Sequence, residues 1–137
     1  MKKIEIDTFL KFRFLSNPHF SPDGTKIAFT VSVPDRETNG YLSDLYLYDL
    51  GKKTVSRVTC AGDAKIWSWT AENTLIFTAA RTAALKKEKE NGISFFYEIS
   101  PSGGEASCRA SVPASVTGIR LLPDGRYLLT IHHDNYK

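Results

Sequence analysis

The first chemistry to test is metal binding, for which the run His132-His133-Asp134 offers two imidazoles and a carboxylate. Neighbouring residues of a strand point to opposite faces, so His132 and His133 cannot easily hold one ion together. His19 lies far earlier in the sequence and does not complete a ligand set. We therefore expect no metal site and no cofactor.

Nucleophilic chemistry needs a serine or cysteine with a base beside it. Ser94 in "GISFF" and Ser102 in "SPSGG" lack the flanking glycines of a G-x-S-x-G elbow and have no suitable partner. Cys60 and Cys108 are too far apart for a C-x-x-C motif, and we expect reduced thiols. Their separation of 48 residues fits equivalent positions in two repeats. The sequence therefore names no catalytic residue.

Aromatic side chains offer a further candidate site, because Trp67 and Trp69 share one face of a predicted strand. Such a pair can stack a ligand, or it can pack one sheet against the next. We favour packing and keep ligand stacking as the alternative.

The composition is that of one globular domain, because 137 residues with 42% hydrophobic content can bury about two thirds of the unfolded surface. The net charge of +3 comes from basic residues scattered among nearly as many acids, unlike the single basic face of a nucleic-acid binder. No stretch approaches the roughly 20 apolar residues that span a bilayer. Charged residues interrupt the start "MKKIEIDTFLKFRFL", which argues against a signal peptide. We expect a cytoplasmic protein that binds neither nucleic acid nor membrane.

The elements that must carry these residues are strands, since the apolar runs are short, rich in β-branched and aromatic residues, and bounded by turn residues. Helical periodicity is confined to a short helix around 7–12, where Asp7 could cap the first turn. We expect strands near 16–21, 26–33, 43–49, 54–59, 65–70, 74–80, 93–99, 105–111, 116–122 and 126–132.

These strands repeat. The segments "HFSPDGTKIAFT", "WSWTAENTLIFTA" and "IRLLPDGRYLLT" each place a tight turn between two apolar strands, at intervals of about 50 residues. Four strands per repeat at this period indicate β-propeller blades. We predict an all-β chain of about two and a half four-stranded antiparallel blades. The lead-in is 1–15, blade one 16–60, blade two 61–111, and the first half of blade three 112–137, so that 1–137 is a partial β-propeller.

The repeated turn is best explained as hairpin geometry. Pro22 supplies the φ of a type I turn, Asp23 suits the next position, and Gly24 takes the left-handed residue that closes the hairpin. Blade two places Glu72 and Asn73 at the last two positions, and Asn is the next-best residue for a left-handed turn. This loose match favours scaffolding over a catalytic or calcium-binding aspartate.

Two longer insertions fall between the second and third strands of their blades, at 34–41 and 81–92. The second contains Lys86-Lys87-Glu88-Lys89-Glu90, and its mixed charges favour a solvated loop. Contact with a partner domain is the alternative. A ring needs about four to eight blades, so the chain alone would expose blade faces and a strand edge, and we expect it to self-associate.

The segments "FLKFRFLSNPHFSPDGTKIAFTVS" and "SDLYLYDLGKKTVSRVT" resemble the start of prolyl oligopeptidase family serine peptidases, of the acylaminoacyl-peptidase and dipeptidyl-peptidase type. The turn itself also occurs in TolB-type propellers. The resemblance implies a non-catalytic propeller that limits the access of short peptides to a C-terminal α/β-hydrolase domain. That domain's serine, aspartate and histidine lie outside this chain, so no catalytic residue carries over.

Some members of that family bind a substrate's amino terminus through a pair of glutamates. Glu88 and Glu90 are separated in sequence and do not form such a pair. A TolB-like propeller used only for protein or ligand binding is the alternative function.

Overall fold

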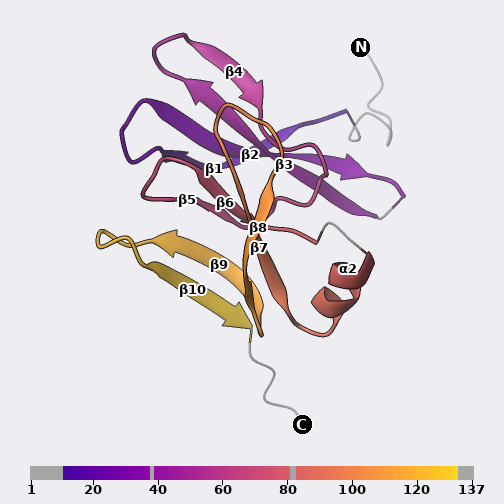
Figure 1. The fold of residues 1–137 in the computed structure, drawn as a ribbon. Coiled ribbons are helices and arrows are strands. Elements are labelled where there is room, and N and C mark those ends of the chain that lie inside the picture. The colour runs from indigo at the N-terminus through magenta and orange to yellow at the C-terminus, as the bar shows by residue number, and fades with distance from the viewer. Residues whose placement is uncertain (1–10, 38, 81–82, 133–137) are drawn as a thin grey trace, which may run out of the picture. The chain divides into compact units, whose positions relative to one another are not determined.

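The computed structural model describes residues 11–37, 39–80 and 83–132. Ten strands lie within these residues (Figure 1). They are β1 (Phe14–Phe20), β2 (Lys26–Asp35), β3 (Gly40–Asp49), β4 (Thr54–Arg57), β5 (Trp67–Trp69), β6 (Leu75–Thr78), β7 (Ser94–Ile99), β8 (Ser107–Val112), β9 (Ser115–Leu121) and β10 (Tyr127–His132). Each matches a strand that the sequence predicts, with ends that differ by a few residues.

The strands form three antiparallel sheets in chain order, β1-β2-β3-β4, β5-β6-β7-β8 and β9-β10. We call them the first, second and third sheets. This arrangement confirms the all-β fold of an incomplete propeller. The chain divides into two compact units, Met1–Ala64 with the first sheet and Lys65–Lys137 with the other two.

The first sheet has two unlike faces, because residues that pair across antiparallel strands share a face. One face carries Ala28, Thr30, Leu45 and Leu47, all buried. The opposite face carries Ile27, Phe29, Tyr46 and Tyr48, which are half-buried. On β3 the two leucines share one face and the two tyrosines the other, as the alternation in "DLYLYD" predicts.

The second sheet is apolar and buried on the face that corresponds to those tyrosines. Trp67 pairs with Phe77 and Trp69 with Leu75, and both tryptophans are buried. Phe77 in turn pairs with Tyr97, and their rings stack with centroids 6.2 Å apart. In the same unit, β9 lies beside β5. The tryptophans are therefore core residues, and ligand stacking on them is not supported.

The three repeated turns have the predicted backbone. The φ angle is +72° at Gly24, +61° at Asn73 and +87° at Gly125. Each of these residues donates its backbone N–H to the carbonyl three positions earlier, with donor–acceptor distances of 2.8 to 3.1 Å. Geometry thus explains why glycine and asparagine alternate at this position.

A β-bulge interrupts β1, and the sequence does not predict this bulge. The pairing with β2 shifts between Ser16 and His19, and Asn17 takes a left-handed φ of +52°. The extra residue returns Phe20 to the face that Leu15 occupies, since Leu15 pairs with Val31 and Phe20 with Ile27.

The prediction of a solvated loop at 81–92 is wrong in part, because α2 (Ala83–Glu90) occupies most of it. Alanine, leucine, lysine and glutamate are strong helix formers, and mixed charges suit an exposed helix as well as a loop. The insertion at 34–41 is also shorter than expected, since β2 extends to Asp35 and β3 begins at Gly40. The short helix expected around 7–12 falls almost wholly outside the described residues.

Candidate functional site

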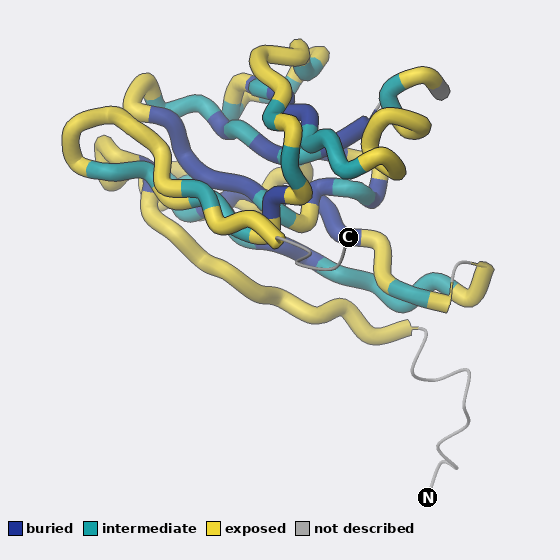
Figure 2. The backbone as a smooth tube through the Cα atoms, turned by 90° about the horizontal axis from the view of Figure 1, so that it is seen from below, coloured by how far each residue is buried: buried dark blue, intermediate teal, exposed yellow. Residues whose placement is uncertain are grey.

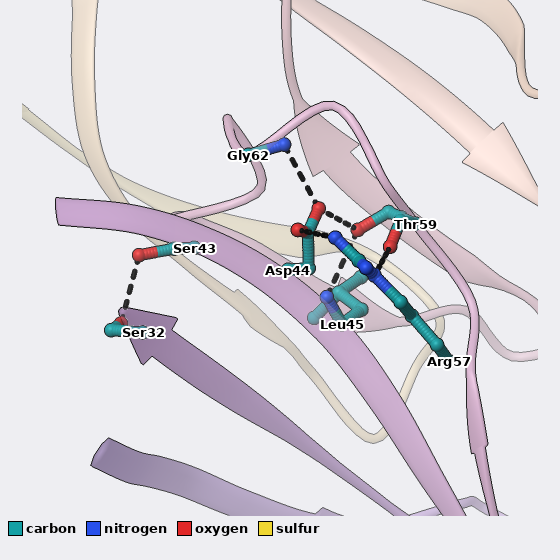
Figure 3. A network of polar contacts seen from close by, with 7 residues as sticks. All are labelled: Ser32, Ser43, Asp44, Leu45, Arg57, Thr59 and Gly62. Atoms are coloured by element: carbon teal, nitrogen blue, oxygen red, sulfur yellow. Dashed lines mark hydrogen bonds and ion pairs between the residues drawn. The ribbon is translucent and has the colours of Figure 1, made fainter. Parts of the chain in front are cut away.

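The densest cluster of polar contacts in the first unit surrounds Asp44 on β3 (Figure 3). Asp44 Oδ2 accepts a hydrogen bond from Arg57 Nη2 at 2.6 Å. Its Oδ1 accepts from Thr59 Oγ1 at 2.8 Å and from the backbone N–H of Gly62 at 3.0 Å. We call these four residues the Asp44 network.

Strand geometry explains why the charged pair forms. Arg57 on β4 pairs with Tyr46, which lies two residues from Asp44 on the same face of β3. Asp44 and Arg57 are therefore diagonal neighbours within reach of a long side chain. Arg57 also donates from Nε to the carbonyl of Thr59 at 2.9 Å, and its guanidinium lies 6.0 Å from the centroid of the Tyr46 ring.

The electrostatics are those of a structural ion pair. The carboxylate of Asp44 is buried, and a buried charge is costly unless it is paired and hydrogen-bonded. The hydrogen bond to Asp44 raises the pKa of Arg57 above its usual value, so the guanidinium keeps its charge at every physiological pH. With three donors on its two oxygens, Asp44 has little capacity left for a substrate proton.

The network holds the segment that leaves the first sheet. The backbone N–H of Ser43 donates to the carbonyl of Gly62, and the N–H of Ala64 donates to the carbonyl of Ser43, each at 2.9 Å. The backbone N–H of Leu45 donates to Thr59 Oγ1 at 2.9 Å. Residues 58–64 are thereby fastened along β3, and the Asp44 network is a scaffold element.

The second sheet fastens its own departing segment through Ser94. Ser94 Oγ donates to the carbonyl of Ala114 at 2.7 Å and accepts from the backbone N–H of Val116 at 3.0 Å. Since Tyr46 and Tyr97 pair with Phe29 and Phe77 in the same way, Ser94 corresponds to Ser43. The hydroxyl of Ser94 therefore has a structural role and is committed to backbone partners.

The same alignment corrects the prediction that Cys60 and Cys108 occupy equivalent positions in two repeats. Cys108 lies in β8 opposite Tyr97, whereas the residue opposite Tyr46 is Arg57. Cys60 lies beyond the end of β4. The two cysteines are exposed free thiols at non-equivalent positions, and the expectation of equivalence is wrong. Loop lengths differ between the two repeats. A spacing close to the repeat length therefore does not place the two cysteines at equivalent positions.

The remaining candidate residues belong to different elements. His19 is in β1 and His132 ends β10, while His133 and Asp134 lie outside the described residues. Ser102 Oγ is hydrogen-bonded to Ser100 Oγ at 2.8 Å. Glu88 and Glu90 are exposed on α2. Within residues 11–37, 39–80 and 83–132, no three His, Cys, Asp or Glu side chains gather as metal ligands.

The turn aspartates do more than fit between their neighbours. Asp23 Oδ1 accepts from Ser21 Oγ at 2.6 Å, from the Thr25 backbone N–H at 3.0 Å and from Thr25 Oγ1 at 2.8 Å. These bonds, that from Ser21 first, lower the pKa of Asp23 to about 2. Asp124 likewise accepts from the backbone N–H of Arg126 at 3.1 Å. Both carboxylates brace a hairpin.

In the second sheet, a hydroxyl braces the turn: Thr70 stands at the position of Ser21, whose Oγ likewise accepts from the backbone N–H of Lys26. Thr70 Oγ1 accepts from the backbone N–H of Thr74 at 3.2 Å, and Thr74 Oγ1 donates to Glu98 at 2.8 Å. The side chain of Glu72 is one methylene longer than aspartate, and the turn is closed without it. The bond that Thr70 accepts explains how the repeat tolerates a glutamate in place of aspartate at position 72.

Sequence reasoning missed the Asp44 network. The available signal was a carboxylate inside the apolar strand "SDLYLYD", with an arginine and a threonine in "SRVT" on the neighbouring predicted strand. A charge in such a strand needs a partner, and the arginine and threonine of the neighbouring strand can provide it.

No protein-family model matches this chain. A sequence relative is the uncharacterized peptidase YuxL of Bacillus subtilis, 28% identical over 133 residues, which cover 94% of this chain and 19% of that protein. The chain therefore spans about a fifth of the length of this relative.

Two solved structures share the fold. The β-propeller domain of the Trilobed protease from Pyrococcus furiosus, described as having an open velcro topology, matches with a TM-score of 0.61 and 15% identity over 88% of this chain and 34% of that one. The acylaminoacyl peptidase of Pyrococcus horikoshii matches with a TM-score of 0.65 and 17% identity over 89% of this chain and 18% of that one. These matches confirm the resemblance to the propeller part of prolyl oligopeptidase-type peptidases.

Proposed function

We propose that this chain is the non-catalytic propeller part of a serine peptidase of the prolyl oligopeptidase family, in which it gates the access of short peptides to a C-terminal α/β-hydrolase domain. The observation that carries the proposal is the match of 94% of the chain to 19% of a protein named as a peptidase. The propeller folds of a protease and of an acylaminoacyl peptidase support it.

The chemistry of the chain supports a non-catalytic part. Ser94 is bonded to the backbone groups of Ala114 and Val116, and Asp44 is enclosed by Arg57, Thr59 and Gly62. A nucleophile has to be aligned with a base and an oxyanion site. The hydroxyl of Ser94 and the carboxylate of Asp44 are instead hydrogen-bonded to groups that hold the strands. The contribution we assign to the chain is therefore steric.

Gating follows from what a propeller can do by shape. A rigid ring over a hydrolase admits extended or short peptides and excludes folded proteins, so selection by size precedes any selection by the active site. The hydrolase domain of the same protein and short peptides are thus the proposed partners, and the cytoplasm is the proposed compartment. Among the described residues, no helix is both long and apolar enough to cross a bilayer.

The segments between second and third strands are the proposed contacts with the hydrolase. They join β2 to β3 and β6 to β7, and the second of them carries α2 with Lys86, Lys87 and Lys89 exposed.

The coding sequence beyond Lys137 tests the proposal directly. We expect further blades and then a G-x-S-x-G elbow followed by aspartate and histidine. The encoded protein should cleave acylated aminoacyl p-nitroanilides and short peptides while leaving folded proteins intact. A coding sequence with propeller repeats and no elbow would contradict the peptidase and favour a TolB-like binding protein.

A further inference from the structure

The helix α2 ends in a cap that leads directly into β7. Gly92 follows the helix with a left-handed φ of +87°, and its backbone N–H donates to the carbonyl of Lys89 at 3.0 Å. The N–H of Ile93 donates to the carbonyl of Glu88 at 3.2 Å. These two bonds form a Schellman motif, which satisfies carbonyls at the end of a helix. The end of α2 therefore sets the path of the residues that follow it.

Ser94 comes next in the chain and is the first residue of β7, where its pairing with Val112 ends the β7–β8 ladder. Its hydroxyl bonds the carbonyl of Ala114 and the N–H of Val116, which belong to the segment that leads from β8 into β9. We call residues 113–116 the β8–β9 segment. The end of a ladder opens more easily than its middle, so the hold on this segment depends on the residues that precede Ser94.

The cap and the β8–β9 segment also lie beside each other. A Cβ atom at Gly92 would be 3.8 Å from Ser115 Oγ, an ordinary van der Waals distance. Residues 92–94 thus form one joint between α2 and the β8–β9 segment.

The first sheet holds its departing segment by other means. There residues 36–39 join β2 to β3, a connection too short for a helix, and Asp44 accepts the bonds from Thr59 and Gly62. The residue of the second sheet that corresponds to Asp44 is Phe95, because Ser94 corresponds to Ser43. A phenylalanine cannot replace the carboxylate as an acceptor. In the second sheet, the hydroxyl beside the helix cap takes over this task.

The helix is exposed, whereas the middle of β7 is buried (Figure 2). Residues 84 and 86–90 of α2 are exposed and Leu85 is half-buried, while Phe95, Phe96 and Tyr97 are buried. Isolated helices of fewer than about 12 residues are marginal in water, and α2 has 8 residues. Small changes can therefore shift the stability of α2 without disturbing the sheet beside it.

We propose that α2 controls how firmly the β8–β9 segment is held. When the helix and its cap are formed, Ser94 is placed to bond both Ala114 and Val116. When the helix frays, residues 92–94 gain conformational freedom and both bonds weaken. Whatever orders α2 thus also fastens the start of β9.

Only the regulatory meaning of this coupling rests on the proposed function. The segment that carries α2 is one that we propose contacts the hydrolase domain, so docking there would tighten the β8–β9 segment. The coupling itself belongs to the chain and is measured without the hydrolase.

Amide hydrogen exchange of Val116 in the 137-residue chain, followed by NMR, tests the coupling. Gly92→Ala strains the left-handed cap without a clash. Gly104→Ala is the matched control, because Gly104 has a φ of +101° in the β7–β8 turn and no atom within 4 Å of an added Cβ. Gly92→Ala should speed the exchange of the Val116 N–H at least about fivefold more than Gly104→Ala does. Equal acceleration by the two variants would overturn the proposal.

The reverse experiment uses the reciprocity of coupled sites. Ser94→Ala leaves the backbone bonds of the cap untouched but releases the β8–β9 segment. It should speed the exchange of the Ile93 N–H at least about threefold, whereas Ser102→Ala should leave it unchanged. An Ile93 amide that does not respond to Ser94→Ala would also overturn the proposal. If Gly92→Ala does not fold, Lys87→Gly weakens the exposed helix through its propensity and takes its place.

The protein encoded by the continuous reading frame separates this inference from the proposed function. Docking of a hydrolase domain on α2 should slow the exchange of Val116 relative to the 137-residue chain. If the variants show the coupling but Val116 exchanges equally in both proteins, the proposed contact at α2 is wrong and the coupling stands. If the continuous protein cleaves peptides but Gly92→Ala acts like its control, the coupling is wrong and the proposed function stands.

Discussion

Arg57 donates to Asp44 over 2.6 Å, and the two side chains differ sharply in their access to solvent. The side chain of Arg57 is 50% exposed and that of Asp44 7% exposed. Water can solvate the guanidinium if the pair is broken, but it cannot reach the carboxylate or its other donors in the same way. Loss of Arg57 would therefore leave a buried carboxylate without its counter-ion, whereas loss of the charge on Asp44 would leave a guanidinium that water can reach.

Asp44→Asn should lower the free energy of unfolding by about 2–3 kcal/mol, because a buried network loses its charge-assisted bonds and gains a donor that faces other donors. Urea denaturation followed by tryptophan fluorescence measures the change. Asp124→Asn, in an exposed turn, is the matched control and should cost less than about 1 kcal/mol.

Arg57→Ala should lower the free energy of unfolding by about 2–3 kcal/mol in the same assay, because it leaves the buried carboxylate of Asp44 without its counter-ion. If Arg57→Ala proves neutral, the donors of Thr59 and Gly62 hold the buried carboxylate by themselves, and the ion pair does not stabilise this corner.

Gly24→Ala should destabilise the chain by about 1–2 kcal/mol. A methyl group at Gly24 would meet no atom within 4 Å, so the whole cost comes from the left-handed φ of +72°. Gly51→Ala, at a turn residue that does not itself have a positive φ, should change the melting temperature little. Equal melting temperatures for wild type and Gly24→Ala would refute the geometric reading of the turn.

The carboxyl of Asp23 should titrate near pH 2 in the folded protein, below its ordinary value of 3.8. Because the folded pKa is lowered, the ionised group stabilises the turn above about pH 4, and this contribution is lost as pH falls through about 2. Carbon-detected NMR of the carboxyl follows the titration. Ser21→Ala removes the largest cause and should raise the pKa, whereas Ser102→Ala should leave it unchanged.

Ser94→Ala should lower stability by about 1–2 kcal/mol, because the Val116 N–H and the Ala114 carbonyl lose their partner. Ser102→Ala, at an exposed turn, should be neutral. A Ser94→Ala chain as stable as the wild type would show that the departing segment of the second sheet is held by other contacts.

The strands and turns could be predicted because their causes are local. The alternation in "DLYLYD" sets which side chains share a face, and a left-handed residue closes each hairpin at Gly24, Asn73 and Gly125. Asn73 takes the left-handed φ that its residue type predicts.

Features with non-local causes could not be predicted from the sequence. The Asp44 network joins β3 to residues 57, 59 and 62, which meet only after the β3–β4 hairpin forms and the chain turns back. The spacing of 48 residues predicts that Cys60 and Cys108 hold equivalent positions in their sheets. They do not, because the loops before them differ in length. The mixed charges of α2 suit an exposed loop and an exposed helix equally well, so the charge pattern alone predicts a loop there. The helix propensity of its residues decides between the two.

The most direct test of the account is a paired assay of peptide hydrolysis. The purified 137-residue chain and the protein encoded by the continuous reading frame are compared on an acetylated aminoacyl p-nitroanilide and on intact casein. We predict the buffer rate for the chain alone, and cleavage of the small substrate but not of casein by the continuous protein. Hydrolysis that co-purifies with the 137-residue chain, or a continuous protein inactive on both substrates, would contradict a non-catalytic propeller that gates a peptidase.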